Sequence, residues 1–447
     1  MERYRDAWVF FSGRLVSLVV LLGFQLLAVR LLEPLQYGRF ALVFAWSLVA
    51  QIVLSFGVQR LIPKYFGQVG NGLRPRAAAR LLWLCLLVRF VGSVVAIALV
   101  GAFWPPAAFT GPGGLAFFAS TLCYIPLSMA QVDTDAIAQA LGLQRASRAA
   151  LLGECVVRFA LTAAGAALGL LSMAWQLLAI GSATAGLSAA LLLAAILRML
   201  ARVPEREGDI GLDWREVMSI AVGGYAGAMA WLCSSPPAVR IIASRCLATL
   251  AFAGFSFAQT LVLSFQRYTP ATLMFPFVEP LVLRQHAQGG EVARMEATLS
   301  LLTKIDLLVI GGAIVGCIVA GEPLVALMTG GRYAQSAFVL PFVLAYVSST
   351  SIYRTLEIVA VVLKVPSAMV WALLPSAITL GLAIWLSPRA GIAVVLAYPL
   401  LDAAARLALF RRALGRHGVR HVFDLPIAAA MLVIGAICAL AGLFAAR

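Results

Sequence analysis

The chain has 447 residues, of which 62% are hydrophobic and only 12% are charged. Soluble proteins carry about 25% charged residues, so the composition excludes a soluble globular protein and predicts an all-α polytopic membrane protein. The formal net charge is +15, with 34 Lys and Arg against 19 Asp and Glu. No hydrophilic basic domain accompanies this excess, which we attribute to orientation in the membrane; we expect no nucleic-acid partner.

Hydropathy predicts about thirteen membrane-spanning helices, each long enough to cross about 30 Å of hydrocarbon. They fall at 9–32, 39–62, 80–103, 113–141, 149–171, 173–200, 217–243, 248–278, 297–320, 334–362, 366–387, 389–411 and 424–445. A hydrophilic linker, 201–216, interrupts them. The predicted domains are therefore an N-terminal six-helix lobe (1–200), the linker, a C-terminal six-helix lobe (217–412), and a basic loop with one extra helix (413–447).

The first apolar run is too long for a signal peptide and lacks a small-residue cleavage site, which predicts an uncleaved first helix. Basic residues in short loops set the orientation of such a chain. With the N-terminus in the cytoplasm, most loop arginines and lysines lie inside. Only five lie outside: Arg240, Arg245, Arg332, Arg389 and Arg447. This distribution predicts a cytoplasmic N-terminus and a cytoplasmic linker.

The turn between the first two spans matches a later stretch of the chain. Its residues Leu32, Leu35, Tyr37 and Phe40 pair in register with Leu247, Leu250, Phe252 and Phe255. Together with the linker, the match indicates two parallel repeats, as in two-lobed transporters.

Charged side chains inside the spans are the best candidates for function, because lipid tolerates them only when they are paired or hydrated. Three arginines have no evident partner in the sequence: Arg14, Arg89 and Arg267. They lie in the cytoplasmic half of their spans, and a guanidinium suits phosphate oxygens. For Arg14, the alternative is that its side chain extends to the inner headgroups. Arg267 continues a polar stripe of Ser256, Thr260 and Ser264 at helical spacing, which indicates a cavity or a neighbouring helix rather than lipid.

Helical spacing also predicts contacts of the acidic residues. Glu154 precedes Arg158 by four positions, as Asp402 precedes Arg406, and both are favourable orders for an ion pair. We interpret both pairs as structural, with proton or sodium coupling as the alternative. Asp135 shares a face with Gln131 and Gln139, whereas Asp133 points elsewhere and is expected to pair with a neighbouring helix.

Other residue types carry weaker signals. The seven cysteines all lie in apolar stretches without a C-x-x-C motif, which is typical of small buried hydrophobes. His417 and His421 are too few for a metal site, so we expect a solvated loop and no metal. Ser234–Pro237 interrupts the seventh span and predicts a hinge or a packed kink.

Three segments resemble bacterial polysaccharide transporters: the first turn, Leu31–Leu42; the stretch GEPLVALMTGGRYAQSAFVL at 321–340; and SRCLATLAFAGFSFAQTL at 244–261. This family comprises the Wzx-type flippases of lipid-linked oligosaccharides, within the MOP superfamily that includes MurJ and the MATE exporters. The sequence departs from it twice. Val239 precedes Arg240 where many relatives have an acid, and the span at 424–445 exceeds a twelve-helix core.

The resemblance implies two six-helix lobes in a V and alternating access. It implies an undecaprenyl-pyrophosphate-linked glycan as substrate, moved from the cytoplasmic to the periplasmic leaflet of the bacterial inner membrane. Glycosyltransferases and a glycan polymerase are the expected protein partners. We expect Arg14, Arg89 and Arg267, with Arg158 in reserve, to bind the pyrophosphate. Asp135, Glu154 and Glu357 are candidates for coupling to a proton or sodium gradient, and no cofactor is expected.

Two alternatives stay open at this point. A MATE-like exporter of cationic drugs would place acids in its cavity. A membrane enzyme of glycan assembly would need polar external loops with positioned acids or histidines, and the outer loops are short and lack histidine. No GxSxG, HExxH or P-loop motif is present. We therefore expect a transporter rather than an enzyme.

Overall fold

The computed structural model describes residues 2–67, 69, 73–103, 113–204, 212–275, 278, 292–362, 371 and 373–416. These residues are almost entirely helical; the described part of the chain has one isolated β-bridge, Val69 with Leu73, and no strand. Within it, 9 helices are long and apolar enough to cross a membrane. The chain is a multi-pass, all-α membrane protein, as its composition predicts.

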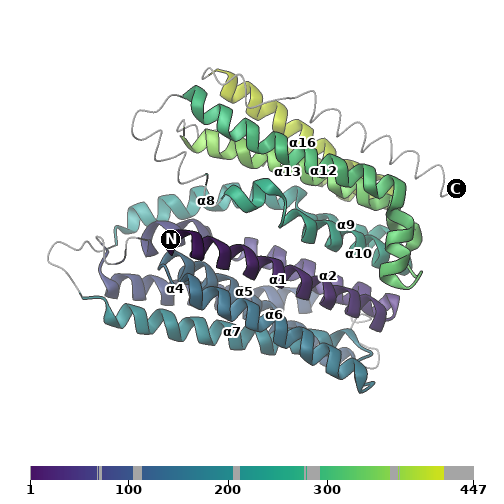
Figure 1. The fold of residues 1–447 in the computed structure, drawn as a ribbon, viewed down its shortest axis with the longest axis horizontal. Coiled ribbons are helices and arrows are strands. Elements are labelled where there is room, and N and C mark those ends of the chain that lie inside the picture. The colour runs from purple at the N-terminus through teal and green to yellow at the C-terminus, as the bar shows by residue number, and fades with distance from the viewer. Residues whose placement is uncertain are drawn as a thin grey trace. The chain divides into compact units, whose positions relative to one another are not determined.

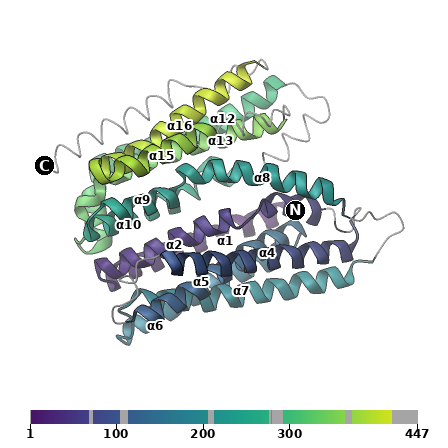
Figure 2. The ribbon, with the colours of Figure 1, turned by 180° about the vertical axis from the view of Figure 1, so that it is seen from behind.

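The chain divides into two compact units, residues 1–228 and 229–447. The division falls inside a helix, whereas the lobes predicted from the sequence meet at the linker 201–216. That lobe assignment remains a prediction. Helices within each unit run side by side (Figures 1 and 2).

The first unit contains six long helices and the beginning of a seventh. They are α1 (Glu2–Leu31), α2 (Pro34–Val53), α4 (Pro75–Phe103), α5 (Gly114–Ala140), α6 (Gln144–Ala167), α7 (Ala174–Arg202) and α8 (Trp214–Ser234). Helix α5 packs mainly on α7, and α1 packs on α6. Large apolar side chains stay exposed on several of these helices, among them Trp83 of α4, Leu161 of α6 and Leu187 of α7, as expected for surfaces that face lipid.

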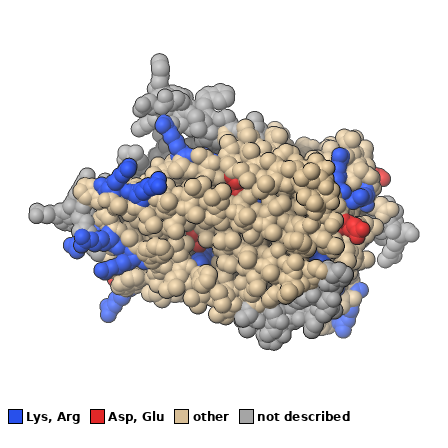
Figure 3. Space-filling model, turned by 90° about the horizontal axis from the view of Figure 1, so that it is seen from below, with Lys and Arg blue, Asp and Glu red and all other residues tan. Residues whose placement is uncertain are grey.

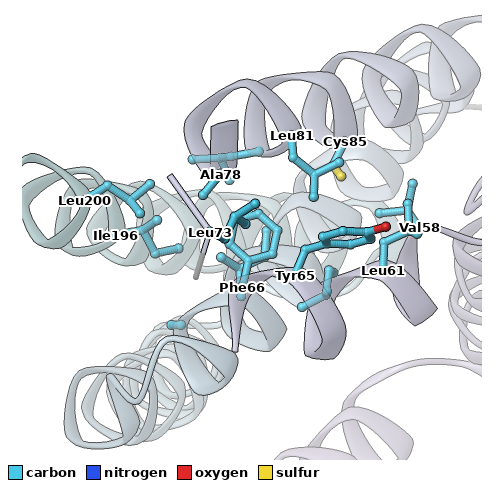
Figure 4. Packing of buried hydrophobic residues seen from close by; sticks show 14 of the residues in the cluster. Val58, Leu61, Tyr65, Phe66, Leu73, Ala78, Leu81, Cys85, Ile196 and Leu200 are labelled. Atoms are coloured by element: carbon cyan, nitrogen blue, oxygen red, sulfur yellow. The ribbon is translucent and has the colours of Figure 1, made fainter. Parts of the chain in front are cut away.

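The second predicted span, 39–62, does not form one helix. Helix α2 ends at Val53, and the chain turns through Phe56 (φ 43°) and Gly57 (φ 77°). A short helix α3 (Val58–Leu61) and a π-helical turn η1 (Ile62–Phe66) follow. Hydropathy could not show this break because both sides of it are apolar. The segment after the turn packs into the core of the unit, where Tyr65 and Phe66 contact residues of α4 and α7 (Figure 4).

The second unit contains α9 (Pro236–Cys246), α10 (Thr249–Gln266), α12 (Val292–Thr329), the 3₁₀ turn η3 (Ala334–Phe338), α13 (Val339–Val362), α15 (Leu373–Ala390) and α16 (Ile392–Gly415). Helix α13 packs on α12, α10 and α16 and is the most buried of the candidate spans. Its neighbours therefore surround it. The predicted extra helix, 424–445, and the two histidines lie outside the described residues.

Two predicted spans of this half are interrupted. The break expected at Ser234–Pro237 is present: α8 ends at Ser234, and Ser235 caps α9 with Pro236 in its first turn. The span predicted at 248–278 ends as α10 at Gln266, and a second helical segment begins at Pro270. In contrast, the ninth span is longer than predicted, because α12 continues through Glu322 and Pro323 to Thr329.

The predicted internal repeat has a local structural counterpart. Glu33 caps α2 with φ −63° and ψ 155°, and its partner in the match, Ala248, caps α10 with φ −61° and ψ 153°. The leucines that precede them, Leu32 and Leu247, are also matched. Ser235, the N-cap residue of α9, has the same conformation (φ −63°, ψ 152°), which is usual at a helix start. The agreement therefore does not test the repeat, which remains a prediction.

Charged side chains lie mainly where the helices end. On the face drawn in Figure 3, Lys and Arg gather toward both ends of the view, and the surface between them is mostly uncharged. An uncharged band flanked by basic residues is the surface that a bilayer selects. The charges that do occur within the helices are therefore the ones to examine for function.

Candidate functional site

Arg89 forms a buried ion pair in the first unit. Its Nη2 donates to Asp133 Oδ1 of α5 over 2.7 Å, and the two side chains are 3% and 1% exposed. Its Nη1 donates to the backbone carbonyl of Gln51 near the end of α2. The expectation that Asp133 pairs with a neighbouring helix is correct, whereas the interpretation of Arg89 as uncompensated is wrong. Arg89 joins α2, α4 and α5.

Glu154 and Arg158 form the ion pair that their spacing predicts. Glu154 also accepts a hydrogen bond from Gln131 Nε2 of α5, and Arg158 lies 5.9 Å from the centre of the Phe24 ring of α1. Glu154 is buried, while the Arg158 side chain keeps 16% of its surface exposed. Arg158 Nε also donates to Thr184 Oγ1 of α7 over 3.4 Å. The cluster therefore links α1, α5, α6 and α7.

Asp135 lies near the end of α5 and is half-buried. Gln139 Nε2 donates to its Oδ2 over 2.8 Å, as expected for residues on one helical face. Ser147 of α6 donates to its other oxygen. Gln131, which the sequence places on the same face, instead binds Glu154. Asp135 and Glu154 thus belong to separate polar clusters.

Arg240 was assigned to an outer loop from the sequence, and this assignment is wrong. It lies inside α9 and is only 3% exposed. Its guanidinium donates to Gln259 Oε1 and Thr260 Oγ1 of α10, each over 2.9 Å. Gln259 Nε2 in turn donates to the carbonyl of Pro236 at the start of α9. The polar stripe of α10 therefore faces a neighbouring helix at this level, one of the two outcomes that its spacing predicts.

Arg267 is the C-terminal cap of α10 and is exposed. No carboxylate of the described residues forms an ion pair with it. Helix C-termini carry partial negative charge, so a guanidinium is electrostatically favourable there. The helix breaks at this residue, so Arg267 lies at the end of a helical segment. The sequence had instead predicted a continuous span over 248–278, with Arg267 inside it.

Asp306 was not among the candidates selected from the sequence. This residue of α12 is fully buried and accepts hydrogen bonds from Ala271 N (2.8 Å) and Ser351 Oγ of α13 (2.6 Å). The sequence offered one signal for Asp306: it is a carboxylate on a mostly apolar helix, three positions after Thr303 and therefore on the same helical face. Its neighbours are distant in sequence, so its partners could not be inferred.

The second predicted intrahelical pair is also present: Arg406 Nη2 lies 2.8 Å from Asp402 Oδ2 in α16, and both side chains are buried. Arg406 also lies over the ring of Tyr353, 4.7 Å from its centre. Thr379 of α15 donates to Asp402 Oδ1 over 3.3 Å. The pair fastens α16 to α13 and α15.

Arg14 lies on α1 and Glu357 on α13, but their side chains fall outside the described structure. Of the four arginines expected to bind pyrophosphate, Arg89 and Arg158 lie in separate clusters of the first unit, and Arg267 lies in the second. Among the described residues, no three His, Cys, Asp or Glu side chains lie close enough to hold a metal ion.

Comparison with known proteins identifies the fold. No protein-family model matches the chain, and no curated protein matches it in sequence. Among solved structures, the lipid II flippase MurJ in an inward closed conformation aligns with a TM-score of 0.62 at 12% identity, over 96% of this chain and 90% of MurJ. The chain has the fold of MOP-superfamily transporters.

Two further MOP-superfamily structures align equally well. An inward-facing multidrug resistance MATE transporter has a TM-score of 0.60 at 11% identity, over 90% of this chain and 94% of its own. A transporter from Pyrococcus furiosus, described as having a binding pocket of reversed polarity, has a TM-score of 0.61 at 11% identity, over 90% and 92%. At such identities the likeness establishes the fold alone.

Proposed function

We propose that the protein is a flippase that moves an undecaprenyl-pyrophosphate-linked oligosaccharide from the cytoplasmic to the periplasmic leaflet of the bacterial inner membrane. It would act by alternating access, with its N-terminus in the cytoplasm, in the synthesis of O-antigen, capsule or exopolysaccharide. The fold is shared with MurJ, which is a lipid II flippase. The three segments that resemble Wzx-type flippases supply the choice of substrate.

The observation that carries the proposal is the contrast between Arg267 and three of the buried acids. A fourth buried acid, Asp306, accepts hydrogen bonds from uncharged donors instead. Asp133, Glu154 and Asp402 are each ion-paired with an arginine. Arg267, at the end of α10, is exposed and has no carboxylate partner among the described residues. The charges of these three acids are compensated within the protein, whereas the guanidinium of Arg267 can bind a ligand. This distribution of charge favours an anionic ligand. A MATE-like exporter of cations would require the opposite.

The roles of the other candidate residues follow from this assignment. Arg14 and Arg158 of the first unit are further candidates for binding pyrophosphate, whereas the buried pair of Arg89 favours a structural role for that residue. Asp135, Glu154 and Glu357 would couple transport to a proton or sodium gradient, without a cofactor. The glycan would come from glycosyltransferases and pass to a polymerase, and the lipid tail would remain in the bilayer.

Complementation of a flippase-deficient strain tests the proposal. Arg267→Ala should abolish complementation at normal membrane expression, because losing a charged hydrogen bond of about 1.5–3 kcal/mol weakens binding roughly 10- to 150-fold. Arg245→Ala is a matched control, since Arg245 is likewise an exposed arginine near the C-terminal end of a helix of the same unit. Full complementation by Arg267→Ala would refute the assignment, as would gradient-driven export of cationic dyes by the purified protein.

A further inference from the structure

The break after α10 has the structure of a new helix start. Leu273 N donates to the carbonyl of Thr269 over 3.0 Å, which makes Thr269 the N-terminal cap of the segment that begins at Pro270. Proline suits the first position of a helix because its fixed φ is helical and its missing N–H needs no acceptor. The first N–H group of the segment that requires an acceptor is therefore that of Ala271.

The usual capping side chain does not satisfy this N–H. The hydroxyl of Thr269 points to the carbonyl of Gln266 (3.1 Å) and the hydroxyl of Thr272 (3.2 Å). The acceptor of the Ala271 N–H is instead Asp306 Oδ1, 2.8 Å away on α12. A carboxylate from another helix thus performs the role that an Asp or Ser normally performs within the same chain segment.

Neighbouring hydrogen-bond donors hold the Asp306 carboxylate beside the Ala271 N–H. Ser351 Oγ donates to its second oxygen over 2.6 Å, so both oxygens have a donor. Burying a carboxylate is unfavourable unless donors compensate it, and the start of a helix adds partial positive charge. Neighbouring polar contacts join the same helices: Gln266 Nε2 donates to Thr350 Oγ1 over 2.9 Å, and Thr303 and Thr355 share a hydrogen bond of 2.8 Å.

We propose that Asp306 is a positioning residue for the headgroup site. By capping the segment that starts at Pro270, it stabilises the break at 267–269 and so determines where Arg267 presents its guanidinium. The inference rests on the proposed function, because it assigns Arg267 an anionic headgroup as ligand. Asp306 itself contacts no ligand in this scheme; it acts through two backbone positions, the N–H of Ala271 and the helix end at Arg267.

Amide exchange of the full-length protein in nanodiscs tests the cap. Asp306→Asn replaces a charged acceptor by a neutral one, and exchange of the Ala271 amide should accelerate on the order of ten-fold. Ser351→Ala, which removes only the donor to Oδ2, should give a smaller acceleration. Thr303→Val is the matched control, because it removes a buried hydroxyl three positions away without touching Ala271. Equal exchange in Asp306→Asn and wild type would overturn the inference.

Measuring the binding of undecaprenyl pyrophosphate then shows whether Asp306 positions Arg267 for the ligand or only stabilises the start of the helix. Arg267→Ala should raise the Kd at least ten-fold, and Asp306→Asn should raise it several-fold. If Asp306 acts through Arg267, the double variant binds like Arg267→Ala alone, within about two-fold.

The outcomes separate the two proposals. Additive effects of Asp306→Asn and Arg267→Ala would overturn the role of Asp306 and leave the flippase assignment standing. Unchanged binding in Arg267→Ala would remove the headgroup site, and the positioning role with it, even if the exchange rate still depended on Asp306.

Discussion

The buried ion pair of Arg89 and Asp133 provides the sharpest test of a structural role. Replacing Arg89 by Met leaves the Asp133 carboxylate, which is 1% exposed, without its cation. Breaking a buried pair in this way costs about 3–5 kcal/mol. For a unit of this size, the loss corresponds to a fall of roughly 6–20 °C in the midpoint of thermal unfolding.

The assay is thermal unfolding of the purified protein in detergent, with a double variant as the control. Arg89→Met together with Asp133→Leu removes both charges, and replacing a buried pair by apolar residues is often neutral. The carbonyl of Gln51 loses a donor in both variants, which costs about 1 kcal/mol. The double variant should therefore regain most of the stability lost by Arg89→Met.

Substrate binding distinguishes this account from a ligand-binding role. If Arg89 recognised the pyrophosphate directly, Arg89→Met would lose binding at wild-type stability, and the double variant would not recover transport. That pattern would refute the structural reading of the pair. Recovery of both stability and transport in the double variant would confirm it.

Three further substitutions have defined outcomes. Gly57→Ala should prevent stable expression, because a Cβ would lie 1.8 Å from a backbone oxygen in α8. Gly142→Ala, at the same φ of 77° but in open space, should lower the free energy of unfolding by only about 1–2 kcal/mol. Gly254→Ala should lower the unfolding midpoint through a clash at 1.9 Å with the hydroxyl of Ser336, and Ser336→Gly in the same chain should relieve it. Asp135→Asn should abolish the dependence of transport in proteoliposomes on an imposed proton or sodium gradient; unchanged dependence would reject its coupling role.

The sequence predicted contacts within a helix better than contacts between helices. The pairs Glu154–Arg158 and Asp402–Arg406 follow from a spacing of four residues. The partner of Arg89 lies 44 positions away on another helix, so no spacing rule could identify it. An arginine without a partner on its own helix was therefore interpreted as uncompensated, although tertiary packing supplies its acid.

Breaks in the helices could be predicted only where the sequence carries a strong local signal such as proline. The break at Ser235 was predicted because two prolines follow two serines. The break at Arg267 had a comparable signal in Pro270, since the residue before a proline disfavours helical dihedrals. The continuous hydropathy of the stretch obscured that signal. The turn at Gly57 had only a glycine, and a single glycine inside an apolar run does not establish a break.

The predicted match between the two turns pairs positions whose surroundings differ. In the register that pairs Leu32 with Leu247, Arg39 of α2 corresponds to Gly254 of α10. Gly254 permits the close approach of the η3 segment, where Tyr333 and Ser336 lie within van der Waals contact of its position. An arginine cannot occupy that space, so the second unit must differ from the first there. The two segments of the second unit that resemble flippases, 244–261 and 321–340, are therefore in direct contact at Gly254, and the absence of a side chain there permits that contact.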